Sequence, residues 1–299
     1  MSGAADKRRR LVWGLLPAGT VMAVFLMVPL ALVIVISLLK AGRYGGFEWS
    51  LDLSAYQKLL YTKRLDGSIT PNISFMVVFL RSVLLAGATT LIRILIAFPC
   101  AYYMSRQSAR VKSVLLLLVM FPFWSNLLLR TTAWIVILRD YGIVNQLLTA
   151  AGLTGEPIQL LYTEGSILLG LVYVYIPFMV LPVFTAMERL DFRLIEAAHD
   201  LYARRMQTLR HVIWPLIAPG VASGAILVFV PSLGAFITPD LLGGGKKLML
   251  GSLIQMQFTT ARNWPYGAAL AVLLMALVLI SLYLSARSAS RDKLRRAGR

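Results

Sequence analysis

Long apolar runs separated by shorter polar stretches dominate the pattern of hydrophobic and polar positions along this chain. Each run reaches the roughly 18 residues that a helix needs to cross a hydrocarbon core of about 30 Å. The runs lack the alternation of barrel strands, and a bilayer offers no water to an irregular backbone. The pattern predicts an all-α membrane protein with six transmembrane helices: Val12–Leu38, Phe75–Tyr103, Val114–Leu138, Ser166–Met187, Leu216–Ile237 and Tyr266–Ala286.

The first run follows a basic cluster, Lys7–Arg10, as the core of a secretory signal does. However, the run from Leu11 to Leu39 is about twice as long as a signal core, and no A-x-A cleavage site follows it. We therefore expect a retained first span.

Charge decides the orientation. Six spans put both termini on one side, and that side carries eighteen of the basic residues against nine on the other. Basic loops stay in the cytoplasm, so both termini are predicted to be cytoplasmic. The same bias accounts for most of the net charge of +17 without nucleic acid as a partner. The predicted organisation is a basic amino terminus (1–11), a six-helix domain (12–287) with a cytoplasmic loop at 188–215, and a basic tail (288–299).

Three loops face outward in this topology. Residues 40–73 contain an apolar–polar stretch, Leu51–Leu60, that predicts a short amphipathic helix in the interface. Residues 139–165 carry turn residues, and residues 238–263 carry a glycine run that predicts a flexible or tightly turning stretch. Seven prolines fall within spans, and each is either a tolerated kink or a hinge: Pro17, Pro29, Pro99, Pro122, Pro177, Pro182 and Pro231.

The sequence holds little catalytic chemistry. The single Cys100 excludes a disulfide framework, and two histidines make no metal site. The glycine–lysine junction near Gly245 is not a P-loop, because Asp240 stands where the first glycine is required. No carboxylate falls within a predicted span, although ion-coupled carriers usually need one at membrane depth. We expect no enzyme and no cofactor, and an energy source on another chain.

A polar segment between the fourth and fifth spans, Glu196–Gly220, is the longest that is neither a terminus nor an outward loop. It predicts two short helices, the second at Arg204–Val212. Helical spacing puts five apolar side chains on one stripe of the first: Leu190, Leu194, Ala197, Ala198 and Leu201. The stripe either packs on its own bundle or receives another protein.

The segment resembles the coupling loop of type I ABC importer permeases. Glu196, Ala197, Ala198 and Pro215 match the family pattern, whereas Tyr202 stands where glycine is usual and Trp214 where leucine is. Glycine permits the turn between the two coupling helices, and a left-handed tyrosine costs about 1–2 kcal/mol. The turn geometry of the family is therefore not expected at Tyr202.

Three further stretches resemble the spermidine/putrescine (polyamine) permeases: Pro122–Asn126 followed by Arg130 and Trp134, Asp240–Gly244, and Asn263–Gly267. This likeness implies a transmembrane permease subunit in the bacterial inner membrane that moves polyamines inward. It also implies a second related permease, two copies of a cytoplasmic ATPase and an extracytoplasmic substrate-binding protein. A self-sufficient secondary transporter, a membrane anchor and an importer of amino-acid-like compounds remain open.

We predict two sets of site residues, of which the resemblance implies the first. The first would contact the ATPase: Glu196, Ala197, Ala198, Asp200, Leu201 and Ala203. The second would line the translocation pathway: Trp124, Asn126, Arg130, Tyr173 and Asp240. Arg81, Arg93 and Arg130 lie in or near spans, where snorkelling or a helix–helix hydrogen bond competes with a pathway role. A guanidinium in the path would repel a polycation, so the residues alone do not favour polyamines.

Overall fold

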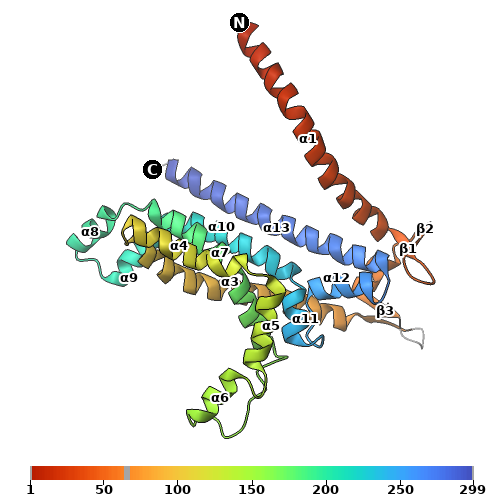
Figure 1. Cartoon of the computed structure of the whole chain (residues 1–299). Coiled ribbons are helices and arrows are strands. Elements are labelled where there is room, and N and C mark those ends of the chain that lie inside the picture. The colour runs from red at the N-terminus through yellow and green to blue at the C-terminus, as the bar shows by residue number, and fades with distance from the viewer. Residues whose placement is uncertain (1, 64–67, 298–299) are drawn as a thin grey trace. The chain divides into compact units, whose positions relative to one another are not determined.

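A computed structural model describes residues 2–63 and 68–297, so residue 1 of the predicted basic amino terminus and residues 298–299 of the predicted tail lie outside it. The chain is mostly helical and divides into two compact units. One unit runs up to Ile73 and includes Ile254–Met275, and the other comprises Ser74–Leu253 with the chain from Ala276 onward. Figure 1 shows the order of the elements.

The first unit begins with the long helix α1 (Ser2–Ser37), followed by two short antiparallel hairpins around a helix. The elements are β1 (Leu39–Ala41), β2 (Phe47–Leu51), α2 (Ser54–Leu60), β3 (Tyr61–Lys63) and β4 (Ile69–Pro71). Helix α2 is the predicted amphipathic helix. The hairpins were not predicted; positive φ angles at Gly45 and Gly46 form the first turn.

The second unit carries the bundle. Its elements are α3 (Ile73–Ser105), α4 (Ala109–Trp124), α5 (Leu127–Leu138), α6 (Ile143–Ala150), α7 (Glu164–Glu188), α8 (Arg193–Asp200), α9 (Arg205–Thr208), the π-helical turn η1 (Leu209–Ile213), α10 (Trp214–Gly234) and α11 (Ile237–Gly243). Helices α12 (Leu250–Thr259) and α13 (Trp264–Ala297) contribute to both units.

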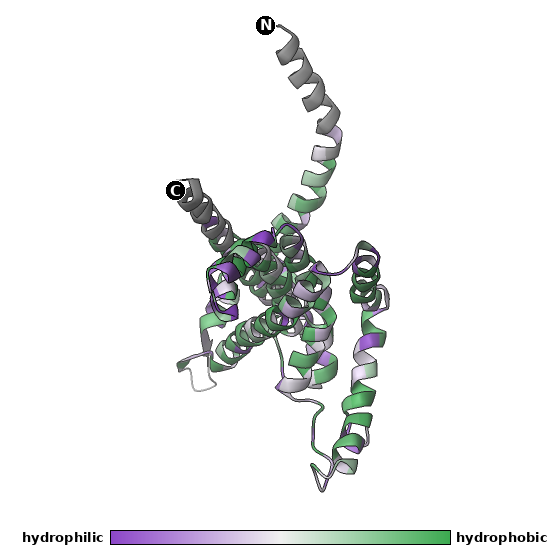
Figure 2. Cartoon of the chain, turned by 90° about the vertical axis from the view of Figure 1, so that its left-hand side faces the viewer, coloured by the Kyte–Doolittle hydropathy of each residue, from purple (hydrophilic) through white to green (hydrophobic). Residues whose placement is uncertain are grey.

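The core of the second unit lies where α3, α7 and α10 meet. Its largest cluster includes Ala97, Met104, Met179, Met187 and Ile217, all buried. Helices α7 and α10 approach closely, because Gly220 and Gly224 have no side chain between the two backbones. Hydrophobic positions dominate the long helices in Figure 2, and many large apolar side chains point outward, as a lipid-facing bundle requires.

Five described helices are long and apolar enough to cross a membrane, and a sixth span results if one bent pair counts as one. The predicted six-span fold is thus confirmed, but the third span is not the continuous helix Val114–Leu138. The chain breaks at Ser125–Asn126 and bends by 88°. Pro122 removes a backbone donor, and the Asn126 side chain accepts a hydrogen bond from the amide of Leu128 (2.8 Å), which starts a new helix.

Two of the loops that are predicted to face outward contain more helix than the turn residues suggested. Residues 139–165 include α6, which is held by the buried Asn145: its side chain exchanges two hydrogen bonds with the backbone of Ile158 (2.9 and 3.0 Å). Residues 238–263 include α12 and part of α11, with Gly244 ending α11 in a left-handed conformation. The glycine run makes the tight turn that the sequence offered as one of two possibilities, since Gly244 and Gly245 both have positive φ angles.

Candidate functional site

The polar loop 188–215 forms a helix–turn–helix. Asp191 precedes α8, and its carboxylate accepts a hydrogen bond from the Arg193 amide (3.0 Å). Helix α8 ends in a Schellman motif: the amide of Ala203 donates to the carbonyl of Ala198 (3.0 Å), and the amide of Tyr202 donates to that of His199 (2.9 Å). A short, well-defined helix therefore projects from the end of α7.

Tyr202 takes the left-handed backbone conformation, with φ of +60°. It occupies the position of a Schellman motif at which glycine is favoured, because a side chain there is strained. The expectation that the turn would depart from the glycine geometry at this position was wrong. The two capping hydrogen bonds hold the tyrosine in place.

The second predicted helix, Arg204–Val212, is only partly α-helical. Helix α9 covers four residues, and the chain then continues through the π-helical turn η1 directly into α10. The backbone amide of Arg204 donates to the Gln207 side chain (2.7 Å), which satisfies one orphan group at the start of α9. The loop is thus continuous with a membrane helix at both ends.

One face of this loop is anchored in the bundle. Leu190, Ile195 and Ile213 are buried in the same core cluster as Met104 and Met187. At the edge, Lys112 and Glu188 form an ion pair (2.6 Å), and the Arg106 guanidinium lies 5.9 Å from the ring centre of Phe192. Movement of the loop would therefore move the ends of the helices on which it packs.

The other face is uncovered. Leu201, Tyr202 and Met206 are 82%, 95% and 70% exposed, and Leu194 and Ala197 are exposed as well. We call these five residues the loop surface. Of the predicted ATPase contacts, Glu196, Ala197, Asp200 and Leu201 are exposed, and Ala198 and Ala203 are half-buried. The predicted apolar stripe divides, because Leu190 is buried in the core.

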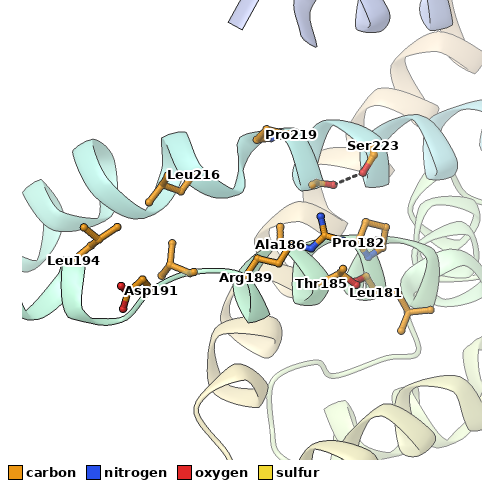
Figure 3. A pocket seen from close by; sticks show the side chains of 12 residues that line it. Leu181, Pro182, Thr185, Ala186, Arg189, Asp191, Leu194, Leu216, Pro219 and Ser223 are labelled. Carbon is orange, nitrogen blue, oxygen red and sulfur yellow. Dashed lines mark hydrogen bonds between the residues drawn. The ribbon is translucent and has the colours of Figure 1, made fainter. Parts of the chain in front are cut away.

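A groove of about 750 Å³ lies beside the loop, between α7 and α10. Figure 3 shows Leu181, Pro182 and Thr185 on one wall and Pro219 and Ser223 on the other. Arg189, Asp191 and Leu194 line the end nearest α8. Sequence reasoning missed this groove, since it depends on how two helices pack across the loop.

The predicted pathway residues lie on elements that pack against one another. Trp124 is exposed at the end of α4, and Asn126 caps α5 across the break. Helices α5, α7 and α11 contact each other, and the ring of Trp134 meets that of Tyr173 edge-on at 5.6 Å. Arg130 is buried, and its Nε has no hydrogen-bond partner among the residues that the structure describes, whereas Asp240 on α11 is exposed. No ion pair joins these two within the described part of the chain.

The other two arginines in or near the predicted spans have partners. Arg81 pairs with Glu164 (3.2 Å) near the start of α7. Arg93 is fully buried and makes helix–helix hydrogen bonds, which confirms that alternative over snorkelling. Within residues 2–63 and 68–297, no cluster of three histidines, cysteines or carboxylates could hold a metal ion.

A family model matches residues 93–296 and is described as "Binding-protein-dependent transport system inner membrane component". The spermidine/putrescine transport system permease protein PotB of Haemophilus influenzae is 37% identical over 262 residues, 87% of this chain and 88% of its own. PotB of Escherichia coli K12 is 36% identical over 230 residues (76% and 82%). The inner membrane ABC transporter permease protein YdcU of the same strain is 36% identical over 264 residues (84% and 81%).

Solved structures share the fold. A chain of a bacterial ABC transporter that imports the acidic polysaccharide alginate superposes with a TM-score of 0.72 at 17% identity, covering 95% of this chain and 98% of the other. A bacterial alginate ABC transporter in complex with its alginate-bound periplasmic protein gives 0.72 at 16% identity, covering 96% of both chains.

Proposed function

This chain belongs to the family of binding-protein-dependent transport system inner membrane components, and from this premise we propose that it is the permease subunit of an ABC importer for polyamines. Its PotB relatives are named for spermidine and putrescine and align over most of both chains. It is a multi-pass inner-membrane protein. Permeases of this class work with a substrate-binding protein and ATPase subunits.

The observation that carries the proposal is the loop surface. Its apolar side chains are exposed, while Ile195 and Ile213 on the opposite side are buried in the bundle. An apolar patch held on a rigid support is suited to bind a partner. The partner we propose is the ATPase, contacting Glu196, Ala197, Ala198, Asp200, Leu201 and Ala203.

The mechanism follows from the connections of the loop. We propose that ATP binding draws two ATPases together and that each moves one loop of this kind. Because a short connection joins α7 to α8, and α9 leads through η1 into α10, the movement passes to both membrane helices. The bundles then rock from inward-facing to outward-facing, receive substrate, and return after hydrolysis. ATP hydrolysis belongs to the partner, and this chain supplies the gate.

The assembly in the proposal contains a second, related permease, two copies of a cytoplasmic ATPase and one extracytoplasmic binding protein. Both termini and the loop 188–215 lie in the cytoplasm. The two-to-one excess of basic residues on the side of the termini supports this orientation. Residues 1–11 and 288–299 would then be basic segments that flank the transmembrane domain.

For the pathway we propose Trp124, Asn126, Arg130, Tyr173 and Asp240. The broken span supports this choice, because its interrupted backbone offers polar groups at the junction of α4 and α5, and irregular backbone at membrane depth belongs beside a cavity. Aromatic faces and a carboxylate attract an ammonium group. Arg130 would instead repel the ammonium group. This repulsion would prevent the substrate from binding tightly within the pathway.

Charge reversal on α8 tests the proposed contact with the ATPase. Glu196→Lys should lower spermidine uptake in cells at least about tenfold, within the usual range of coupling between sites, with a normal membrane level of the chain. Glu156→Lys is the matched control, because Glu156 is also exposed but belongs to residues 139–165, outside the loop 188–215. The proposal fails if Glu196→Lys imports normally, or if the chain alone imports in liposomes under an ion gradient.

The substrate is tested on the binding protein. Calorimetric titration of the cognate binding protein should show binding of spermidine or putrescine and none of basic amino acids. Binding of amino acids alone would contradict the polyamine assignment and leave the importer assignment intact.

A further inference from the structure

Arg93 is a cation in the middle of the bundle. It lies in the second half of α3, and its side chain is completely buried. No carboxylate pairs with it in the part of the chain that the structure describes. Taking a charged side chain out of water costs desolvation free energy, which a carboxylate partner would in part offset. Packing alone therefore does not explain an arginine at this position.

The guanidinium joins three helices. Its Nε donates to the carbonyl of Val172 on α7 (3.2 Å), and its Nη2 donates to the carbonyl of Leu171. Its Nη1 donates to the hydroxyl of Ser232 on α10 (3.1 Å). The ring of Tyr175 on α7 lies 5.3 Å from the guanidinium carbon. The planar fork of arginine meets acceptors in these different directions, which a lysine ammonium does not do in the same way.

Both partner helices carry a proline next to this contact. Pro177 lies about one and a half turns after the two acceptor carbonyls on α7, and Pro231 directly precedes Ser232 on α10. Each proline removes a backbone hydrogen bond and weakens its helix at that level. Helices α7 and α10 are also the two that enter and leave the loop 188–215. One proline-weakened point of each helix thus lies beside this contact, and Arg93 connects the two.

We propose that Arg93 is a positioning residue for transport: it holds the proline hinges of α7 and α10 against α3. The segments of α7 and α10 between these prolines and the loop then turn about the point that Arg93 holds. Movement of the loop therefore opens the gate and does not only bend the two helices. The proposal rests on the proposed function, since it assigns the hinge of the same gate.

The test uses the complete transporter, reconstituted with its ATPase, partner permease and binding protein. The readout is substrate imported per ATP hydrolysed, which a purely structural loss of complex would leave unchanged. Arg93→Met should lower this ratio at least about tenfold while ATP is still hydrolysed. Arg93→Lys should give an intermediate ratio, because the charge stays but the divergent donors are lost. Arg81→Lys is the control on the same helix, since its lysine keeps the charge facing Glu164.

An unchanged ratio in Arg93→Met overturns the proposal. If that variant does not assemble, Ser232→Ala decides in the same assay. Ser281→Ala is its control, because the Ser281 hydroxyl donates to the carbonyl of Leu277 within its own helix (2.8 Å). A ratio lowered in Ser232→Ala alone supports the proposal, and equal ratios overturn it. Failure of the proposed function is distinct: the wild-type complex would then show neither uptake nor ATP hydrolysis stimulated by the binding protein.

Discussion

Tyr202 occupies the one backbone position at which the polar loop reverses direction. Its left-handed conformation is the usual place of glycine, yet the tyrosine side chain is 95% exposed on the loop surface. The residue therefore combines backbone strain with an apolar ring that the chain itself does not cover. Strain retained at such a position is consistent with a contact made by the ring to a partner.

Removing the side chain should separate these two effects. Tyr202→Gly is expected to stabilise the purified chain by about 1 kcal/mol, because the left-handed penalty disappears. Thermal unfolding in detergent measures the change, and Tyr202→Val should shift the transition in the opposite direction. Copurification of the ATPase should weaken in the glycine variant. A glycine variant less stable than the wild type would contradict the strain argument.

Asp52 gives a pH-dependent contact at the start of α2. The Ser54 hydroxyl (2.7 Å) and then the Ser54 amide (2.9 Å) donate to its carboxylate, and these hydrogen bonds hold the pKa of Asp52 below its ordinary value. A depressed folded-state pKa adds stability that is present above the ordinary value of about 3.9 and is lost as pH falls through the folded value.

Helix α2 should therefore open more readily in acid. Hydrogen exchange at Ser54–Leu60, corrected for its intrinsic pH dependence, should become faster below the pKa of Asp52. Asp52→Asn removes the titration and should flatten the response. The same acid response in both proteins would exclude this carboxylate as its source.

At the scale of elements, close backbone packing holds α7 against α10. A Cβ at Gly220 would meet the Cβ of Ala186 at 2.4 Å and the carbonyl oxygen of Pro182 at 2.8 Å. Neither neighbour is the flexible end of a long side chain, so the helices would have to separate. This contact lines the groove and joins the helices that enter and leave the loop.

Gly220→Ala is expected to destabilise the chain by about 1–3 kcal/mol through overpacking. Gly87→Ala is the matched control within a long helix, because a Cβ there meets nothing within 4 Å and should give a small gain in helix propensity. Thermal unfolding of both variants measures the difference. Equal transition temperatures would show that α7 and α10 can separate to accept the methyl group with no loss of stability.

The broken third span shows that single residues can interrupt a helix that hydropathy predicts to be continuous. Hydropathy predicts one helix from Val114 to Leu138, since no residue in it is charged except Arg130. Pro122 and the cap at Asn126 are local signals that were available in the sequence. They indicate a possible break but no angle. The bend of 88° depends on the packing of α5 against α7 and α11.

At the scale of the whole molecule, the proposed orientation makes two exposed tyrosines accessible from opposite sides of the membrane. Tyr44 is 94% exposed and Tyr202 is 95% exposed. Labelling of a cysteine at either position is therefore limited by the membrane and not by burial. In a Cys100→Ser background, an impermeant maleimide should label the Tyr44→Cys variant in intact spheroplasts.

The Tyr202→Cys variant should be labelled only after the membrane is opened. Labelling of this variant in intact spheroplasts would reverse the proposed topology, and with it the assignment of the loop surface to a cytoplasmic ATPase. Labelling of both variants only after lysis would place Tyr44 on the inner side and contradict the six-span topology.

The sequence by itself determined the class of protein, the number of spans and the position of the polar loop. These follow from the length of apolar runs and from motif spacing, which are local properties of the chain. The tertiary structure alone decided which face of α8 is uncovered, where the groove lies and what Arg93 contacts. Those depend on which distant segments meet: Arg93 is one arginine among three near spans in the sequence, and only the packing of α3, α7 and α10 gives it partners.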